Sequence, residues 1–106
     1  MNKVLLLGYV GRDPEIQYVG KRPVAQLSLA TNEPPRVLPD GSVAEAPTEW
    51  HRLVMWDQNA ETAEKYIRKG TRLFVEGQLR TRTWQDRNTI KHTVTEILVT
   101  YMDIIK

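Results

Sequence analysis

Residues 72–84 alternate between apolar and polar side chains with a period of two, which predicts a long β-strand over 71–84. The odd positions are apolar or small and are expected to point inward: Leu73, Val75, Gly77 and Leu79. The even positions are expected to point outward: Arg72, Phe74, Glu76, Gln78, Arg80, Arg82 and Trp84. A turn at residues 85–88 and a final strand at 89–105, with alternating Thr, Val and Ile, follow this segment.

The rest of the chain divides into short segments of strand length and one helix. Strands are predicted at residues 4–7, 24–31 and 48–56. Residues 59–68 predict a helix, with Asn59 as its N-cap and Gly70 at its C′ position. The helix has a narrow apolar stripe formed by Ala60, Ala63, Tyr66 and Ile67. Residues 32–47 hold four of the six prolines, so they predict a long loop or a loose hairpin that projects from the body.

Five strands with one short helix between the third and the fourth predict an all-β fold, a five-stranded OB-fold Greek-key barrel. A length of 106 residues is that of a single domain, and the absence of cysteine excludes a disulfide scaffold or a thiolate zinc site. The longest apolar run, Val4–Leu7, is far shorter than the ~20 residues of a membrane span. No secretory signal is recognisable, so a cytoplasmic location without a membrane partner is expected.

Two predicted strands carry tryptophan and arginine on the same face. Trp50, Arg52 and Trp56 share one face of the segment at 48–56, just as Arg80, Arg82 and Trp84 share one face of the segment at 71–84. Exposed aromatic rings stack on bases, with about 1–3 kcal/mol for each base, while guanidinium groups contact phosphates. A surface for single-stranded nucleic acid is therefore predicted. The alternative is that each tryptophan belongs to the core, and a β-bulge would exchange the two faces of a strand.

The distribution of charge favours the same surface. The net charge is only +2, but residues 72–91 hold five basic and two acidic residues.

Enzyme functions have little support in the sequence. The segment Gly8-Tyr-Val-Gly11 is too short for a phosphate loop, and the two histidines, His51 and His92, have no metal-ligand spacing around them. No catalytic residues, no metal site and no cofactor are expected.

Several segments resemble the bacterial single-stranded DNA-binding protein family (SSB) over nearly the whole chain. They are Asn2-Lys-Val-Leu-Leu-Leu-Gly8, Gly11-Arg-Asp-Pro-Glu15, Leu29-Ala-Thr31, Thr48-Glu-Trp-His-Arg-Leu-Val54, Tyr66-Ile-Arg-Lys-Gly70 and Val75-Glu-Gly-Gln-Leu-Arg-Thr-Arg-Thr-Trp84. The resemblance implies an OB-fold that binds single-stranded DNA without sequence preference in replication, repair and recombination. It also implies a homo-oligomer, usually a homotetramer.

The resemblance assigns roles to individual positions. Trp50, Trp56 and Trp84 match the base-stacking aromatics of the family, and Arg52, Arg80 and Arg82 match its phosphate contacts. Further DNA-binding candidates are Lys3, Arg68, Lys69 and Arg72. For Arg68 and Lys69, stabilisation of the helix C-terminus is an equal alternative. The expected subunit interface comprises His51 together with Lys3, Val4, Leu5, Leu6 and Leu7 of the first strand.

Two features depart from the family pattern. The long loop begins Asn32-Glu-Pro-Pro-Arg36, where the family commonly has another aromatic residue. The family usually ends in an acidic tail that recruits replication and repair proteins, so such partners are expected only if a tail is present. These departures leave an alternative function open, an OB-fold protein-interaction module such as a primosome-like accessory factor with incidental DNA affinity. An enzyme or an RNA-specific binder has less support.

Overall fold

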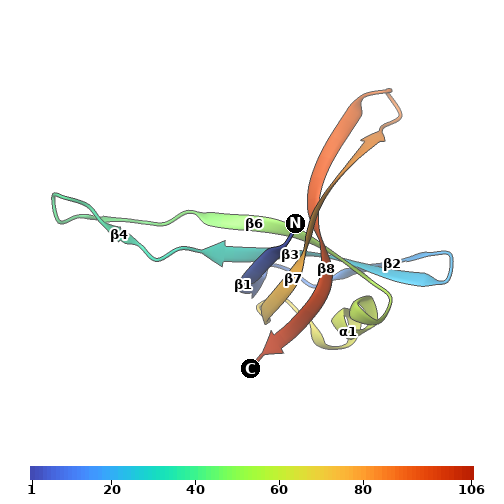
Figure 1. The fold of residues 1–106 in the computed structure, drawn as a ribbon, viewed down its shortest axis with the longest axis horizontal. Helices are drawn as coiled ribbons and strands as arrows, with labels where there is room; N and C mark the ends of the chain where they lie inside the picture. The colour runs from blue at the N-terminus through green and yellow to red at the C-terminus, as the bar shows by residue number, and fades with distance from the viewer.

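The computed structural model describes all residues 1–106, which form eight β-strands and one helix (Figure 1). The strands are β1 (Val4–Val10), β2 (Glu15–Val19), β3 (Arg22–Asn32), β4 (Arg36–Val37), β5 (Val43–Ala44), β6 (Thr48–Trp56), β7 (Arg72–Gln85) and β8 (Lys91–Ile105). The helix α1 (Gln58–Tyr66) connects β6 to β7. The main sheet has the order β1-β7-β8-β6-β3-β2, and a further pairing of β1 with β3 closes five of its strands into a barrel.

The barrel confirms the predicted fold, with β1, β3, β6, β7 and β8 as its five strands and α1 between the third and the fourth. Closure occurs where Tyr9 and Val10 of β1 pair with Ala30 and Leu29 of β3. On the other side of the barrel, β6 pairs in parallel with β8 through Leu53 and Val54. A parallel pair between strands so far apart in sequence depends on the crossover that α1 and β7 provide.

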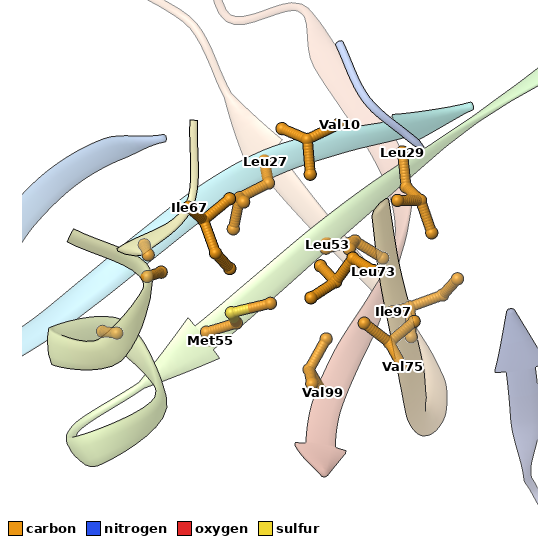
Figure 2. Packing of buried hydrophobic residues seen from close by; sticks show 13 residues of the cluster. Val10, Leu27, Leu29, Leu53, Met55, Ile67, Leu73, Val75, Ile97 and Val99 are labelled. Carbon is orange, nitrogen blue, oxygen red and sulfur yellow. The ribbon is translucent and has the colours of Figure 1, made fainter. Parts of the chain in front are cut away.

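The core is the barrel interior, and it is wholly apolar. Thirteen buried residues form one cluster, in which leucine, valine, isoleucine and methionine side chains from all five barrel strands meet (Figure 2). The helix contributes Ala60 and Ala63, and Ile67 follows at its end, so α1 covers the barrel with small residues and one large one. No polar or charged residue is buried. At about 25 cal/mol for each Å² of buried apolar surface, this cluster is the main source of stability.

Three hairpins extend beyond the barrel (Figure 1). The β2–β3 hairpin turns at Gly20 and Lys21, and the β3–β6 pair continues into the short hairpin of β4 and β5. Of the two alternatives predicted for residues 32–47, a long loop or a loose hairpin, the structure shows the hairpin. The third extension comprises residues 80–96, which we call the β7–β8 arm; its strands stay paired out to Gln85 and Lys91.

Some local predictions are wrong. The strand β2, Glu15–Val19, is absent from the predicted strands, because it is only five residues long and only Ile16 of it packs against the barrel core. The helix ends at Tyr66, which is 66% exposed and so does not belong to the buried stripe. Asp57 occupies the N-cap position in place of Asn59. Gly70, with φ of 89°, lies in the turn after the helix, where the amide of Thr71 donates to the carbonyl of Arg68.

The faces of β7 follow the predicted alternation, with one exception. Leu79 is 51% exposed, because at this residue β7 leaves the barrel and no second layer covers it. A β-bulge is present, but it lies in β8: Gly77 pairs with Val99 and Glu76 with Tyr101, so Thr100 is the extra residue. Its hydroxyl donates to the carbonyl of Glu76. The bulge exchanges the faces of β8, not those of β7.

Candidate nucleic-acid interface

Trp50 lies on the outer face of β6, and 59% of its surface is exposed. One side of its indole packs on Gly11: a Cβ at this glycine would lie 2.4 Å from Cζ3 of Trp50. Gly11, the residue after the end of β1, therefore supports one face of the Trp50 ring, and a side chain at position 11 would clash with that ring. An aromatic ring that is held on one side and open on the other is suited to stacking with a flat ligand.

A groove runs beside Trp50, and we call it the Trp50 groove. Its polar lining includes Arg12, Gln26, Ser28, Arg52 and Arg82. Only four of its fourteen lining residues are hydrophobic, whereas pockets for small molecules are mostly apolar. An open, polar groove with guanidinium groups and an exposed indole fits an extended, charged chain better than a compact ligand.

The arginines of the groove differ in their freedom to bind an anion. The Nε of Arg82 forms an ion pair with Oε1 of Glu96 at 3.0 Å, so this guanidinium is oriented by a nearly buried carboxylate. Arg52 has no ion pair. Of the other acidic groups in the lining, Asp13 accepts a hydrogen bond from the amide of Lys69. Arg12, another exposed arginine of the lining, has no ion pair either, so Arg52 and Arg12 are the guanidinium groups of the groove most available to a phosphate.

Trp84 lies on the β7–β8 arm, directly opposite His92. The two rings stack with centroids 4.5 Å apart and an interplanar angle of 20°. Nε2 of His92 is 2.8 Å from Oδ2 of Asp86, while Oδ1 of Asp86 accepts from the amides of Asn88 and Ile90 in the turn. These hydrogen bonds, the one from His92 first, hold the pKa of Asp86 below its usual value. Trp84 is thus a second ring with one supported face, and 44% of it is exposed.

Trp56 shares the face of Trp50 but lies six residues further along β6, roughly 20 Å away at the ordinary rise of a strand. The guanidinium of Arg22 covers its ring, with Cζ 4.6 Å from the ring centroid. Trp56 is only partly exposed. In the free protein it is the least accessible of the three indoles.

Comparison with known proteins identifies the family of this chain. The model of the single-strand binding protein family matches residues 1–105. The chain belongs to this family. A solved structure of a Plasmodium falciparum SSB complex with ssDNA is 37% identical to it, with a TM-score of 0.86. That similarity covers 100% of this chain and 96% of the other.

Several of the predicted DNA-binding residues of this single-strand binding protein lie in two places, the Trp50 groove and the β7–β8 arm. Trp50, Arg52 and Arg82 line one groove. Arg80 points to the same side of β7 as Arg82 and Trp84, and it has no ion pair. The β7–β8 arm carries four basic residues against two acidic residues, Asp86 and Glu96. Four of the five basic residues that the sequence analysis counted in residues 72–91 therefore lie on this arm.

The four further candidates do not line the Trp50 groove. Nζ of Lys3 is 2.6 Å from a carboxylate oxygen of Glu76. Arg68 donates from Nη1 to the carbonyls of Glu64 and Ile67, which supports its alternative role at the helix C-terminus. Lys69 follows in the same turn, and Arg72 pairs with Tyr9 at the opposite end of β7 from the arm. Their part in DNA binding stays a prediction.

The predicted interface residues of the first strand alternate between two environments. Val4 and Leu6 pack against the chain's own core, whereas Leu5 and Leu7 are exposed on the outside of the barrel. Tyr9 continues the exposed row. His51 is half-buried, and its Nε2 is 2.8 Å from the hydroxyl of Thr31.

Sequence reasoning missed several residues at this interface. Arg12 and Gln26 line the groove, Gly11 supports Trp50, His92 supports Trp84, and Arg22 covers Trp56. Arg12 could have been found, because it stands in one of the segments that resemble the family. The other contacts depend on pairing between strands.

No group of three or more metal-ligating side chains is present, and α1 is too short to cross a membrane.

Proposed function

We propose that this chain binds single-stranded DNA without sequence preference and so protects exposed strands during replication, repair and recombination. The observation that carries the proposal is the Trp50 groove, where an exposed, supported indole lies beside the free guanidinium of Arg52. The similar Plasmodium falciparum structure is a complex with ssDNA, and family membership favours the same ligand here. The alternative of a protein-interaction module with incidental DNA affinity is not favoured.

The mechanism follows from the two kinds of contact. A base stacks on the open face of Trp50 or Trp84, which is possible for all four bases because each has a flat π-face. Arginines neutralise the phosphates and release condensed counterions, so affinity depends strongly on salt. Neither contact needs a bond to be made or broken, so we propose a binding function without catalysis.

A titration with oligo-dT is expected to quench the tryptophan emission, and the observed affinity is expected to fall with salt. The logarithmic slope on salt concentration is about −0.7 for each phosphate neutralised. Arg52→Gln is expected to weaken binding and to make the slope shallower by about 0.7, since it removes one phosphate contact. Fluorescence titrations at four or more salt concentrations measure both quantities.

Lys65→Gln is the matched control, because Lys65 is an exposed cation on α1, away from the groove. Its slope is expected to equal that of the wild type. An emission spectrum that oligo-dT leaves unchanged at low salt would contradict the proposed function. A competitor RNA of equal length and equal affinity would change the ligand class from DNA to single strands in general.

We also propose that the chain forms a homotetramer, in which the first strand contributes one contact. Support comes from the exposed row of Leu5, Leu7 and Tyr9 on the outside of the barrel and from the edge of β1 before Tyr9, which pairs with no strand other than β7. Exposed apolar rows and unpaired strand edges are the usual sites of contact between protein chains.

Leu7→Glu is expected to lower the oligomeric mass, because it places a charge in the proposed apolar contact. Sedimentation velocity of the wild type is expected to show four chains of 12.3 kDa. The control is Val43→Glu, an equally polar change at an exposed valine of the β4–β5 hairpin. A monomeric wild type would be incompatible with this assembly.

A further inference from the structure

Arg22 connects the tip of one hairpin to the end of another strand. It is the first residue of β3, two residues before Val24, which pairs with Trp56. From there its guanidinium lies over the indole of Trp56 and forms a two-pronged ion pair with Asp57: Nε to Oδ1 is 3.1 Å and Nη2 to Oδ2 is 2.9 Å. These hydrogen bonds keep the pKa of Asp57 below its usual value, so the pair is fully charged at neutral pH.

Asp57, the acidic partner in this ion pair, has an unusual backbone conformation. Its φ of 56° and ψ of −121° lie in a region that glycine adopts freely and other residues rarely adopt. Asp57 stands at the N-cap of α1, yet its carboxylate makes no capping hydrogen bond. An aspartate in a strained N-cap position would normally cap the helix. Here its side chain is committed to Arg22 instead.

The ion pair is also open to exchange. The side chains of Arg22 and Asp57 are 61% and 54% exposed, so water and ions reach both groups. An exposed ion pair contributes little to stability and is easily replaced. A guanidinium binds a phosphate with the same fork geometry with which it binds a carboxylate.

We propose that Arg22 is a further contact for the phosphate backbone of single-stranded DNA, and that Asp57 holds its guanidinium over Trp56 until a phosphate replaces the carboxylate. The proposal rests on the proposed function. It extends the path of the strand from the Trp50 groove along β6 to the β2–β3 hairpin. When the guanidinium turns to a phosphate, the ring face of Trp56 becomes available to a base, so the two contacts form together.

Because Asp57 competes with the phosphate, removal of its charge is expected to tighten binding. Asp57→Asn keeps the size of the side chain, and asparagine tolerates unusual turn conformations as well as aspartate does. We expect this variant to bind oligo-dT at least about 5-fold more tightly at low salt. Arg22→Gln is expected to bind more weakly, with a salt slope shallower by about 0.7.

Two controls on α1 match these charge changes. Glu64→Gln removes one negative charge, as Asp57→Asn does, and Lys65→Gln removes one positive charge, as Arg22→Gln does. Affinities within twofold of the wild type are expected for both. If Asp57→Asn binds like Glu64→Gln and the slope of Arg22→Gln equals that of the wild type, Arg22 is not a contact. A wild type that does not bind oligo-dT would overturn this proposal and the proposed function together.

A second measurement tests the cover on Trp56 without DNA. In a background with Trp50→Phe and Trp84→Phe, Trp56 is the only one of the three tryptophans left. Acrylamide is expected to quench its emission more efficiently after Arg22→Gln, because the guanidinium no longer lies over the ring. Equal quenching with and without Arg22, in variants whose circular dichroism spectra agree, would exclude the cover.

Discussion

A Trp50→Ala variant is expected to bind oligo-dT about 5- to 150-fold more weakly than the wild type, which corresponds to the loss of one stacked base. Its free energy of unfolding is expected to change by less than about 1 kcal/mol, because the ring is largely exposed and not part of the core. A tryptophan in the core would cost ~3–5 kcal/mol on truncation. Fluorescence anisotropy of a labelled oligomer and a thermal melt measure the two effects.

Tyr66→Ala provides the comparison. Tyr66 is an exposed aromatic residue at the end of α1 and does not line the Trp50 groove. It is expected to bind oligo-dT within twofold of the wild type. If the two alanine variants lose affinity equally, Trp50 has no special role. If Trp50→Ala unfolds the protein, the indole belongs to the fold and not to a binding surface.

Gly8→Ala is expected to destabilise the barrel by about 3 kcal/mol or more, because the added methyl group has no space. A Cβ at this position would lie 2.1 Å from the carbonyl oxygen of Ala30, the residue that pairs with Tyr9 where the barrel closes. The obstacle is backbone and cannot turn aside as a side chain would. Thermal unfolding is expected at a midpoint lower by roughly 12–24 °C.

The control is Gly20→Ala in the turn between β2 and β3. Gly20 has a φ of 63°, and no atom lies within 4 Å of the position of its Cβ. Only the unfavourable backbone conformation is expected to act there, at about 1–2 kcal/mol. Equal shifts of the two midpoints would mean that the closure of β1 on β3 is not sensitive to the spacing at Gly8.

The aromatic faces were predictable because they depend on one strand at a time. Alternation along residues 48–56 correctly assigned Trp50, Arg52 and Trp56 to one face of β6. Alternation along residues 72–84 correctly assigned Arg80, Arg82 and Trp84 to one face of β7. The bulge that would have exchanged these faces lies in β8, at Thr100. Nothing in the local sequence of β8 distinguishes that residue from the other threonines of the strand.

The support of each ring was not predictable. A turn at residues 85–88 would place Trp84 opposite Thr89, whereas the actual turn at 86–90 pairs it with His92. A small shift in a turn therefore changes the neighbour of every residue on the arm. The contact of Arg22 with Trp56 depends on the β2–β3 hairpin, which places Arg22 at the end of β6. The strand β2 is absent from the predicted strands, so this contact is not predicted either.

The sequence by itself determined the fold class, the number and order of the barrel strands, and the face on which each tryptophan and arginine lies. These properties follow from the period of the backbone and from the positions of proline and glycine, which act over a few residues. The tertiary structure alone decided that Gly11 supports Trp50, that Arg82 joins Arg52 in one groove, and that Arg22 closes over Trp56. These contacts join residues far apart in the chain, and they depend on strand register and barrel closure, which only the packing of the whole domain sets.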